Sequence, residues 1–247
     1  MLPTAREVTH VLNAAVVVWG ARPCVKRIGR PYTARMQQQI FEQLENAGLP
    51  VSEAQAHQLA EYLALMERWN KVYNLTGITD HDEMIQRHLV ESLVFKRYLR
   101  GTRIADVGSG AGLPGIPLAI TSPEIEITLI ESRGKKARFL RHVQGVLDLA
   151  NTSVEQSRAE DLTPMPLFDT VLARAVAALP ELLALSRHLL AREGILLVIT
   201  KANYHSEATA LGKGVRARCV EDPVTKLLRG SLVIIETADS RWQESSR

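Results

Sequence analysis

A glycine-rich turn between an apolar run and a helical pattern constrains the fold of this chain most strongly. Residues 104–115 read IADVGSGAGLPG, which places four glycines and a proline within eight residues. Glycine adopts positive φ angles readily and allows a ligand to approach the backbone closely. A strand that passes through such a turn into a helix is typical of nucleotide-binding α/β folds. The turn therefore predicts a nucleotide site at the end of a parallel strand.

The chain after residue 101 alternates short apolar runs with helical stretches. This alternation predicts an α/β fold, a Rossmann-like, mostly parallel, doubly wound sheet. The last two apolar runs are separated by a polar loop and predict an antiparallel pair. We expect strands at 104–107, 125–131, 154–157, 169–173, 195–200, 215–220 and 231–237, and helices at 114–121, 134–149, 178–192 and 203–211.

The residues before this region have a helical pattern. A helical period opens at Met36, and Ser52 followed by Gln55 has the spacing of a capping box. A second helix is expected to start at Asp80 and run to about Leu99, after a polar linker at 70–77. The predicted organisation is an extension at 1–35, a helical cap at 36–100, a ligand-binding core at 101–238 and a tail at 239–247.

Composition indicates an ordinary globular chain. Of the 247 residues, 46% are hydrophobic and 23% are charged, which excludes wholesale disorder. Its two cysteines, Cys24 and Cys219, exclude a disulfide scaffold and a cysteine-built zinc site, so we expect a reducing, cytoplasmic location and no metal. The apolar stretch at 11–21 is too short to cross a bilayer, so no membrane partner is expected.

Positive charge is concentrated at the start of the chain. The formal net charge is +3, but residues 1–35 carry six basic residues and one acidic residue. The rest of the chain is therefore nearly neutral, and any nucleic-acid surface there must come from local clustering. We expect residues 1–35 to be a poorly ordered extension or sequence upstream of the true start.

Two ligands are compatible with the glycine-rich turn. Read from Gly110, it matches the dinucleotide pattern GxGxxG with Glu131 in the next strand, so an NAD-dependent oxidoreductase remains open. Asp106 favours S-adenosylmethionine, because a carboxylate at the mouth of the loop repels a pyrophosphate and attracts the ammonium and sulfonium of this donor. The backbone N–H groups around Gly108, Gly110 and Gly112 would then take the carboxylate of the donor.

Acidic residues after the next two strands fit the rest of such a cofactor. Glu131 is expected to accept both ribose hydroxyls, as an acid in that position does for many nucleosides. Glu160 follows the third strand, where the edge of the adenine would lie.

Basic residues cluster beside this predicted site. The stretch 132–142 holds five cations without an acid, and positive charge at a helix amino terminus opposes the helix dipole. Phosphate contact would explain that arrangement, although a solvated face is the plainer explanation. Single cations are also expected at three strand ends, where the ligand crevice of an open sheet lies. The residues expected to bind RNA are Arg133, Lys135, Lys136, Arg138, Arg158 and Lys201, and Arg174 ends the fourth strand.

The target atom is suggested by what the sequence lacks. No Asn/Asp-Pro-Pro-aromatic loop follows the fourth strand, which disfavours methylation of an exocyclic amine, and neither cysteine is placed for covalent addition to a pyrimidine. A ring nitrogen such as guanine N7 has a free lone pair and requires mainly positioning. Arg174 is the candidate for that positioning, and no other catalytic residue is assigned.

Five motifs in order resemble one bacterial family. They are WNKVYNLT from Trp69, RHLVES from Arg87, DVGSGAGLPGIP from Asp106, KARFL from Lys136 and ARAV from Ala173. Residues 36–237 are similar to the small-subunit ribosomal RNA guanine-N7 methyltransferases of the GidB/RsmG type. The resemblance implies a class I methyltransferase fold with an amino-terminal helical cap.

The resemblance also implies an activity and a set of contacts. The expected reaction is methyl transfer from S-adenosylmethionine to guanine N7 in the decoding-site (530) loop of 16S ribosomal RNA. The expected partner is this RNA, either free or within the small ribosomal subunit or its precursor. The family pattern assigns donor contacts to Gly108, Leu113, the Ala159-Glu160 pair and Arg174. A non-catalytic RNA-binding assembly factor stays a third hypothesis. His88, amid apolar helix positions, is expected to be structural rather than a general base.

Overall fold

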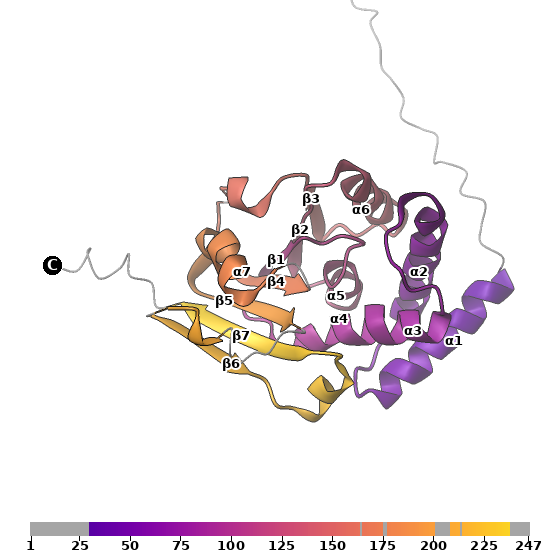
Figure 1. The fold of residues 1–247 in the computed structure, drawn as a ribbon. Helices are drawn as coiled ribbons and strands as arrows, with labels where there is room; N and C mark the ends of the chain where they lie inside the picture. The colour runs from indigo at the N-terminus through magenta and orange to yellow at the C-terminus, as the bar shows by residue number, and fades with distance from the viewer. Residues whose placement is uncertain (1–29, 164, 175–176, 201–207, 213, 238–247) are drawn as a thin grey trace, which may run out of the picture.

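A seven-stranded sheet with helices on both faces forms the body of the molecule (Figure 1). The computed structural model describes residues 30–163, 165–174, 177–200, 208–212 and 214–237. The strand order is β3-β2-β1-β4-β5-β7-β6. The strands are β1 (Arg103–Val107), β2 (Glu126–Ile130), β3 (Thr152–Glu155), β4 (Phe168–Arg174), β5 (Leu190–Thr200), β6 (Val215–Cys219) and β7 (Ser231–Thr237).

The sheet topology confirms the predicted fold class. Strands β3, β2, β1, β4 and β5 pair in parallel, while β7 pairs antiparallel with both β5 and β6. The chain order reverses between β1 and β4, because β2 and β3 lie on one side of β1 and later strands on the other. In open α/β sheets the ligand crevice lies at this reversal, outside the carboxyl ends of the strands. The glycine-rich turn leaves β1 at that edge.

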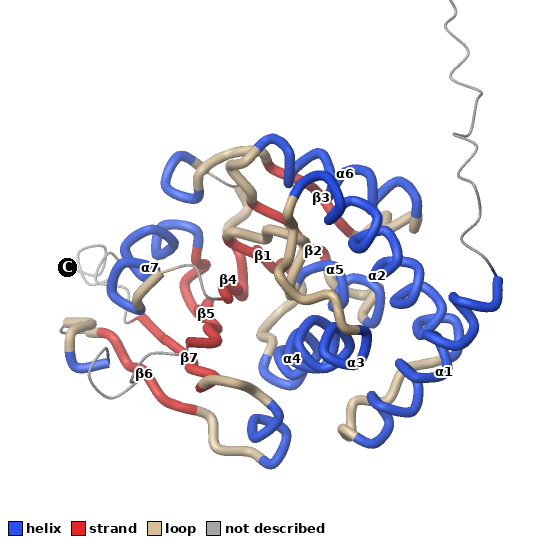
Figure 2. The backbone as a smooth tube through the Cα atoms, turned by 45° about the vertical axis from the view of Figure 1, so that its right-hand side comes forward, coloured by secondary structure: helices blue, strands red, loops and turns tan. Residues whose placement is uncertain are grey.

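Each face of the sheet is covered by a separate layer. The larger hydrophobic cluster joins one face to α5, α6 and the preceding helices, and the smaller cluster joins the other face to α7. Figures 1 and 2 show the helices before β1 gathered on the side of α5 and α6, away from α7. The helices are α1 (Arg30–Asn46), α2 (Glu53–Tyr73), α3 (His81–Met84), α4 (Glu91–Val94), α5 (Gly115–Thr121), α6 (Gly134–Val146) and α7 (Leu179–Ser186).

The helices before β1 pack as a cap, and their starts follow local signals. Ser52 and Gln55 form the predicted capping box at the start of α2, and the Asp80 side chain accepts from the N–H of Glu83 at the start of α3. The run from α3 to Tyr98 is one continuous helix that passes through a π-helical turn at Ile85–Val90 and ends in a 3₁₀ turn. One extra residue is thereby accommodated in the middle of this helix.

Several predicted boundaries were wrong. Helix α1 begins at Arg30, before Met36, and α2 continues to Tyr73, so the linker expected at 70–77 is shorter. Helix α7 ends at Ser186 and β5 begins at Leu190, whereas a helix was expected to continue to 192. Strand pairing overrides helical propensity there, because Leu190 pairs with Phe168 of β4. The expected helix at 203–211 and the tail at 239–247 lie wholly or mostly outside the described residues, as does most of 1–35.

No helix among the described residues is long and apolar enough to span a bilayer, and no group of three or more metal-ligating side chains occurs among them.

Candidate functional site

The glycine-rich turn after β1 has a backbone conformation that requires its glycines. Gly108, Gly110 and Gly112 have φ angles of 69°, 60° and 90°, a region that residues with a Cβ atom avoid. The N–H groups of Gly108 and Ser109 donate to the carbonyl of Ile130 at 2.9 and 3.1 Å, which ties the turn to β2. A Cβ atom on Gly112 would lie 2.5 Å from the Cγ1 atom of Ile116, so the start of α5 packs directly against this glycine.

Asp106 ends β1 beneath this turn and lies deeper than the open position expected at the mouth of the loop. The side chain is completely buried, and its Oδ2 atom accepts from the N–H of Gly115 at 3.0 Å. The Oδ1 atom is buried as well and has no hydrogen-bond partner among the described residues. Burial raises the pKa of Asp106 to about 7, although the bond from Gly115 and the charge of Arg174 oppose the rise.

Glu131 follows β2 and joins the same turn. Its Oε2 atom accepts from the N–H of Gly110 at 2.9 Å, and its Oε1 atom accepts from the N–H of Arg133 at 2.8 Å. The side chain is buried, yet each carboxylate oxygen can accept a further hydrogen bond. Glu131 therefore fixes the turn after β1 against the start of α6 and lies where the sequence predicts a ribose contact.

Arg174 ends β4 and reaches from the sheet to the cap. Its Nη1 atom donates to the main-chain carbonyl of Arg87 at 2.7 Å and lies 3.6 Å from the Oε2 atom of Glu91. Burial lowers the pKa of Arg174, and the charges of Glu91, Tyr62 and Asp106 oppose that shift. The guanidinium thus contacts the cap, and it lies near enough to Asp106 for the two charges to affect each other.

Two further cap residues line this position. The fully buried hydroxyl of Tyr62 donates to the carbonyl of Ala111 in the turn at 2.7 Å. His88 is buried, with Nε2 3.0 Å from the hydroxyl of Thr76, while its Nδ1 atom has no partner among the described residues. Burial and the nearby charge of Arg174 lower the pKa of His88 to about 4. A neutral, buried imidazole fits the structural role expected for it.

The segment after β3 is more open. Ala159, Glu160 and Asp161 form a short 3₁₀ turn in which Ala159 is buried and Glu160 is exposed. The Nη1 atom of Arg158 lies 3.4 Å from the Oε1 atom of Glu160, and both side chains are exposed. Arg158 is therefore paired locally. Lys201, the third strand-end cation of the prediction, lies outside the described residues.

Five cations follow Glu131 on and beside the first turns of α6, and we call them the basic row. None of the five forms a salt bridge with a carboxylate in the described part of the chain. Arg141 donates to the side-chain oxygen of Gln156 at 3.2 Å. The basic row comprises Arg133, Lys135, Lys136, Arg138 and Arg141.

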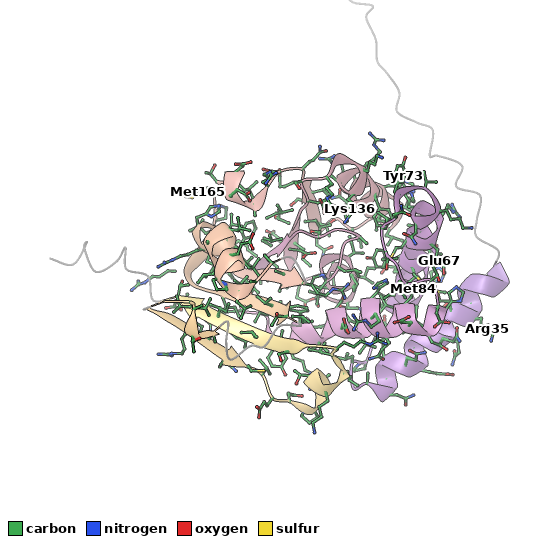
Figure 3. The ribbon with its side chains drawn as sticks, viewed as in Figure 1. Arg35, Glu67, Tyr73, Met84, Lys136 and Met165 are labelled. Carbon is green, nitrogen blue, oxygen red and sulfur yellow. The ribbon has the colours of Figure 1, made fainter. Side chains whose placement is uncertain are left out.

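Members of the basic row have different surroundings. The Nζ atom of Lys136 lies 3.7 Å from the position that a Cβ atom on Gly110 would occupy, so this lysine stands over the glycine-rich turn. The Nζ atom of Lys135 lies 6.0 Å from the ring centre of Tyr73, at the end of α2. Figure 3 shows Lys136 and Tyr73 on the same side of the molecule, far from Met165. Lys136, which the sequence assigns to RNA, therefore lies close to the predicted cofactor loop as well.

Three site residues were not predicted from the sequence. Tyr62, Arg87 and Glu91 lie in helical patterns that mark them only as cap positions. Arg87 and Glu91 pair with each other, and the contacts of the three residues outside the cap join positions 49 to 138 residues apart in the chain. The available signal was that the hydroxyl of Tyr62 and the carboxyl of Glu91 fall on the apolar side of predicted helices. Polar groups buried there require hydrogen-bond partners.

Comparison with known sequences identifies relatives over most of the chain. The family model described as rRNA small subunit methyltransferase G (GidB) matches residues 55–231. A protein of that name from Klebsiella pneumoniae subsp. pneumoniae is 41% identical over 179 residues, which cover 72% of this chain and 86% of the relative. Another from Enterobacter sp. (strain 638) is 39% identical over 203 residues, covering 81% and 98%.

Solved structures share the fold at low sequence identity. The O-methyltransferase TomG from Streptomyces achromogenes, solved in complex with SAM, superposes with a TM-score of 0.51 at 15% identity and covers 82% of this chain and 99% of TomG. A caffeoyl-CoA O-methyltransferase described as putative, from Staphylococcus aureus, gives 0.50 at 13% identity, covering 81% and 98%. These two likenesses concern the fold, and the sequence matches carry the assignment. The chain belongs to the rRNA small subunit methyltransferase G (GidB) family.

Proposed function

We propose that this chain transfers a methyl group from S-adenosylmethionine to N7 of a guanine in the decoding-site (530) loop of 16S ribosomal RNA, in the cytoplasm. The observation that carries the proposal is the juxtaposition of a buried acidic cradle with an exposed basic row at one sheet edge. The cradle consists of the glycine-rich turn with Asp106 and Glu131 behind it. Membership of a family of ribosomal RNA methyltransferases supports the same conclusion.

The residues of the cradle fit a cationic cofactor. The Oδ1 atom of Asp106 is a buried carboxylate oxygen without a donor, and such an atom is costly unless a partner or positive charge is supplied. A cofactor that carries an ammonium and a sulfonium supplies positive charge, whereas a dinucleotide brings two negative phosphates. Glu131 retains acceptor capacity for ribose hydroxyls after its two bonds to backbone N–H groups.

Positioning is the main task left to this chain. Guanine N7 has a lone pair and no proton to lose, so the reaction needs no general base. When bound, S-adenosylmethionine supplies the methyl group, and its sulfur takes the electron pair of the bond that breaks. Arg174 is held at the end of β4, and a guanidinium N–H can donate to O6 of a guanine, which orients the base and leaves the N7 lone pair free for the methyl group. Burial lowers the pKa of His88 to about 4, which makes its imidazole a weak base, so it is assigned no proton transfer.

The basic row supplies the RNA contact in this proposal. Its cations face solvent or the glycine-rich turn and are not neutralised by described carboxylates, so phosphate groups can take that place. Lys136 extends toward the turn and would lie nearest the reacting groups, while Lys135 and Arg138 are exposed on the same helix.

The direct test is mapping of the product. Small-subunit RNA and small subunits from cells that lack this modification are incubated with the chain and labelled donor, and the modified nucleotide is located by mass spectrometry. We expect 7-methylguanosine in the decoding-site loop. Label on an exocyclic amine, on another loop or on protein would contradict the proposal.

Binding measurements separate this proposal from the two alternatives. Calorimetry with S-adenosylhomocysteine and with NAD distinguishes a methyl donor site from a dinucleotide site, and binding of NAD alone would reject the proposal. An assembly factor without catalysis would keep its cellular role after Arg174→Ala, whereas we expect that substitution to abolish the modification.

A further inference from the structure

Glu91 is the most buried acid of the cap, and it lies at a junction of three elements. The residue is 3% exposed and stands directly after the π-helical turn. Its Oε1 atom accepts from the Nη1 atom of Arg87 and from the main-chain N–H of Arg229 at 3.3 Å. Its Oε2 atom faces Nη1 of Arg174 at 3.6 Å. One carboxylate therefore contacts the cap, the carboxyl end of β4 and the segment before β7.

Arg174 depends on the cap for its described contacts on this side. Its Nη1 atom donates to the carbonyl of Arg87 and forms an ion pair with the carboxylate of Glu91, and both partners belong to the same helical run. The side chain of Arg174 is 18% exposed and that of Arg87 is 14% exposed. Two guanidinium groups at this depth repel each other and require a counter-charge.

We propose that Glu91 is a positioning residue that orients the Arg174 guanidinium toward the reacting guanine. The carboxylate of Glu91 balances the charges of Arg87 and Arg174 and holds the Nη1 atom of Arg174 in place. Because the guanidinium is planar, fixing Nη1 also sets the direction in which its other N–H groups point. The inference rests on the function proposed above for Arg174 and adds the residue that controls it. The cap thereby completes the reaction site as well as covering the sheet.

Activity measurements test this role with matched variants. Glu91→Gln keeps the size of the side chain and removes the charge, so we expect kcat to fall at least tenfold while KM for RNA stays within threefold. Arg174→Gln should also lower kcat. The double variant should be no slower than Arg174→Gln alone in single-turnover labelling, because the two substitutions remove the same interaction between Glu91 and Arg174.

The control is a carboxylate on the same helical run. Glu83 pairs with exposed Arg229 at 3.3 Å and makes no contact with Arg174 among the described residues, so Glu83→Gln should keep activity within twofold. If Glu91→Gln fails to fold, the variant Arg87→Gln/Glu91→Gln removes one charge of each sign from the cluster. We expect that variant to regain the wild-type melting temperature and to stay at least tenfold slower.

A second readout does not depend on activity. With ¹⁵N-labelled arginine side chains, wild-type Arg174 should give a sharp, distinct signal, and Glu91→Gln should broaden it or move it toward the position of mobile arginines. An unchanged Arg174 signal would overturn the inference, as would a Glu91→Gln enzyme within twofold of wild type or a double variant slower than Arg174→Gln by the full additive amount. If wild type forms no 7-methylguanosine, the proposed function fails, and the arginine signal still decides whether Glu91 positions Arg174.

Discussion

The carboxylates and the cations at the candidate site are held in opposite ways. Asp106 and Glu131 are buried, and each accepts hydrogen bonds from backbone N–H groups of the glycine-rich turn or of α6. Residues of the basic row are mostly exposed and lack a described carboxylate partner. The acids are part of the framework that shapes the turn, whereas the cations are available to an external anion.

This contrast separates two kinds of substitution. Changes in the cradle should alter cofactor affinity and stability together, because the side chains that hold the turn are the ones proposed to contact the cofactor. Changes in the basic row should alter RNA affinity while stability stays constant. Lys136 is the exception, since it stands over the turn.

The largest effect is expected for Gly112→Ala. The new Cβ would lie 2.5 Å from the Cγ1 atom of Ile116, at a backbone φ of 90°. Overpacking costs about 1–3 kcal/mol and a left-handed backbone about 1–2 kcal/mol, so affinity for S-adenosylhomocysteine should fall about a hundredfold in calorimetry.

Gly212→Ala is the matched control for this substitution. Gly212 has a φ of 84°, and nothing lies within 4 Å of its Cβ position, so it carries the backbone cost without the clash. Its cofactor affinity should match that of wild type. Equal losses in the two variants would show that strain in the chain, rather than the packing of the turn, limits binding.

A tenfold effect is expected from the titration of Asp106. Its pKa of about 7 means that the carboxyl is largely protonated at pH 6, and the ammonium group that S-adenosylhomocysteine shares with the donor favours the ionised form. Affinity for S-adenosylhomocysteine should therefore rise about tenfold from pH 5.5 to pH 7.5. In Asp106→Asn this rise should disappear, and a persisting rise would assign the titration to another group.

The titration of Asp106 should also lower the stability of the cofactor-free chain as the pH rises. Because burial raises the pKa above the ordinary value of 3.8, the folded chain holds this proton more tightly than the unfolded chain, and the contribution of Asp106 to stability falls between pH 3.8 and about 7. At pH 8 without cofactor, Asp106→Asn should melt at or above the wild-type temperature in differential scanning calorimetry. A clearly lower temperature would mean that the ionised carboxylate stabilises the fold.

Effects of several-fold are expected in the basic row. Lys135→Ala and Lys136→Ala should each reduce the slope of log affinity for RNA against log salt by about 1. Lys136→Ala should also weaken binding of S-adenosylhomocysteine a few-fold, whereas Lys135→Ala should not. Lys226→Ala, an exposed lysine on the turn at Pro223–Leu227, should leave both quantities unchanged. Identical behaviour of Lys135 and Lys136 would remove the distinction drawn between them.

The smallest effect is expected for Glu160→Gln. Its pairing with Arg158 at 3.4 Å is exposed, and exposed pairs contribute less than about 1 kcal/mol. The melting temperature should change little, and donor affinity should change by less than about threefold. A loss of tenfold or more in calorimetry would show that Glu160 contacts the cofactor strongly despite its exposure.

Local signals in the sequence predicted much of the fold correctly. The capping box at Ser52, the helix start at Asp80 and the last strand at Ser231–Thr237 depend on residues close together in the chain. The turn at 108–115 was recognisable for the same reason. The end of α7 was misplaced because no glycine or proline occurs from 181 to 193, and only pairing with β4 reveals that Leu190 is in a strand.

Distant contacts could not be predicted. The burial of Asp106 follows from packing of the turn and α5 over β1, and the sequence suggested a more open position. Arg174 was expected at the ligand edge, but its bond to the carbonyl of Arg87 joins residues 87 positions apart. No local pattern encodes such a pair, so the partners of a candidate site residue cannot be predicted from its neighbours in the sequence.

The bond from Tyr62 to Ala111 has a consequence for motion. Opening the cap would expose a fully buried hydroxyl and free a carbonyl of the glycine-rich turn. In hydrogen-exchange measurements, the amides of α2 near Tyr62 and those of the turn should therefore lose protection at the same rate, as one cooperative unit.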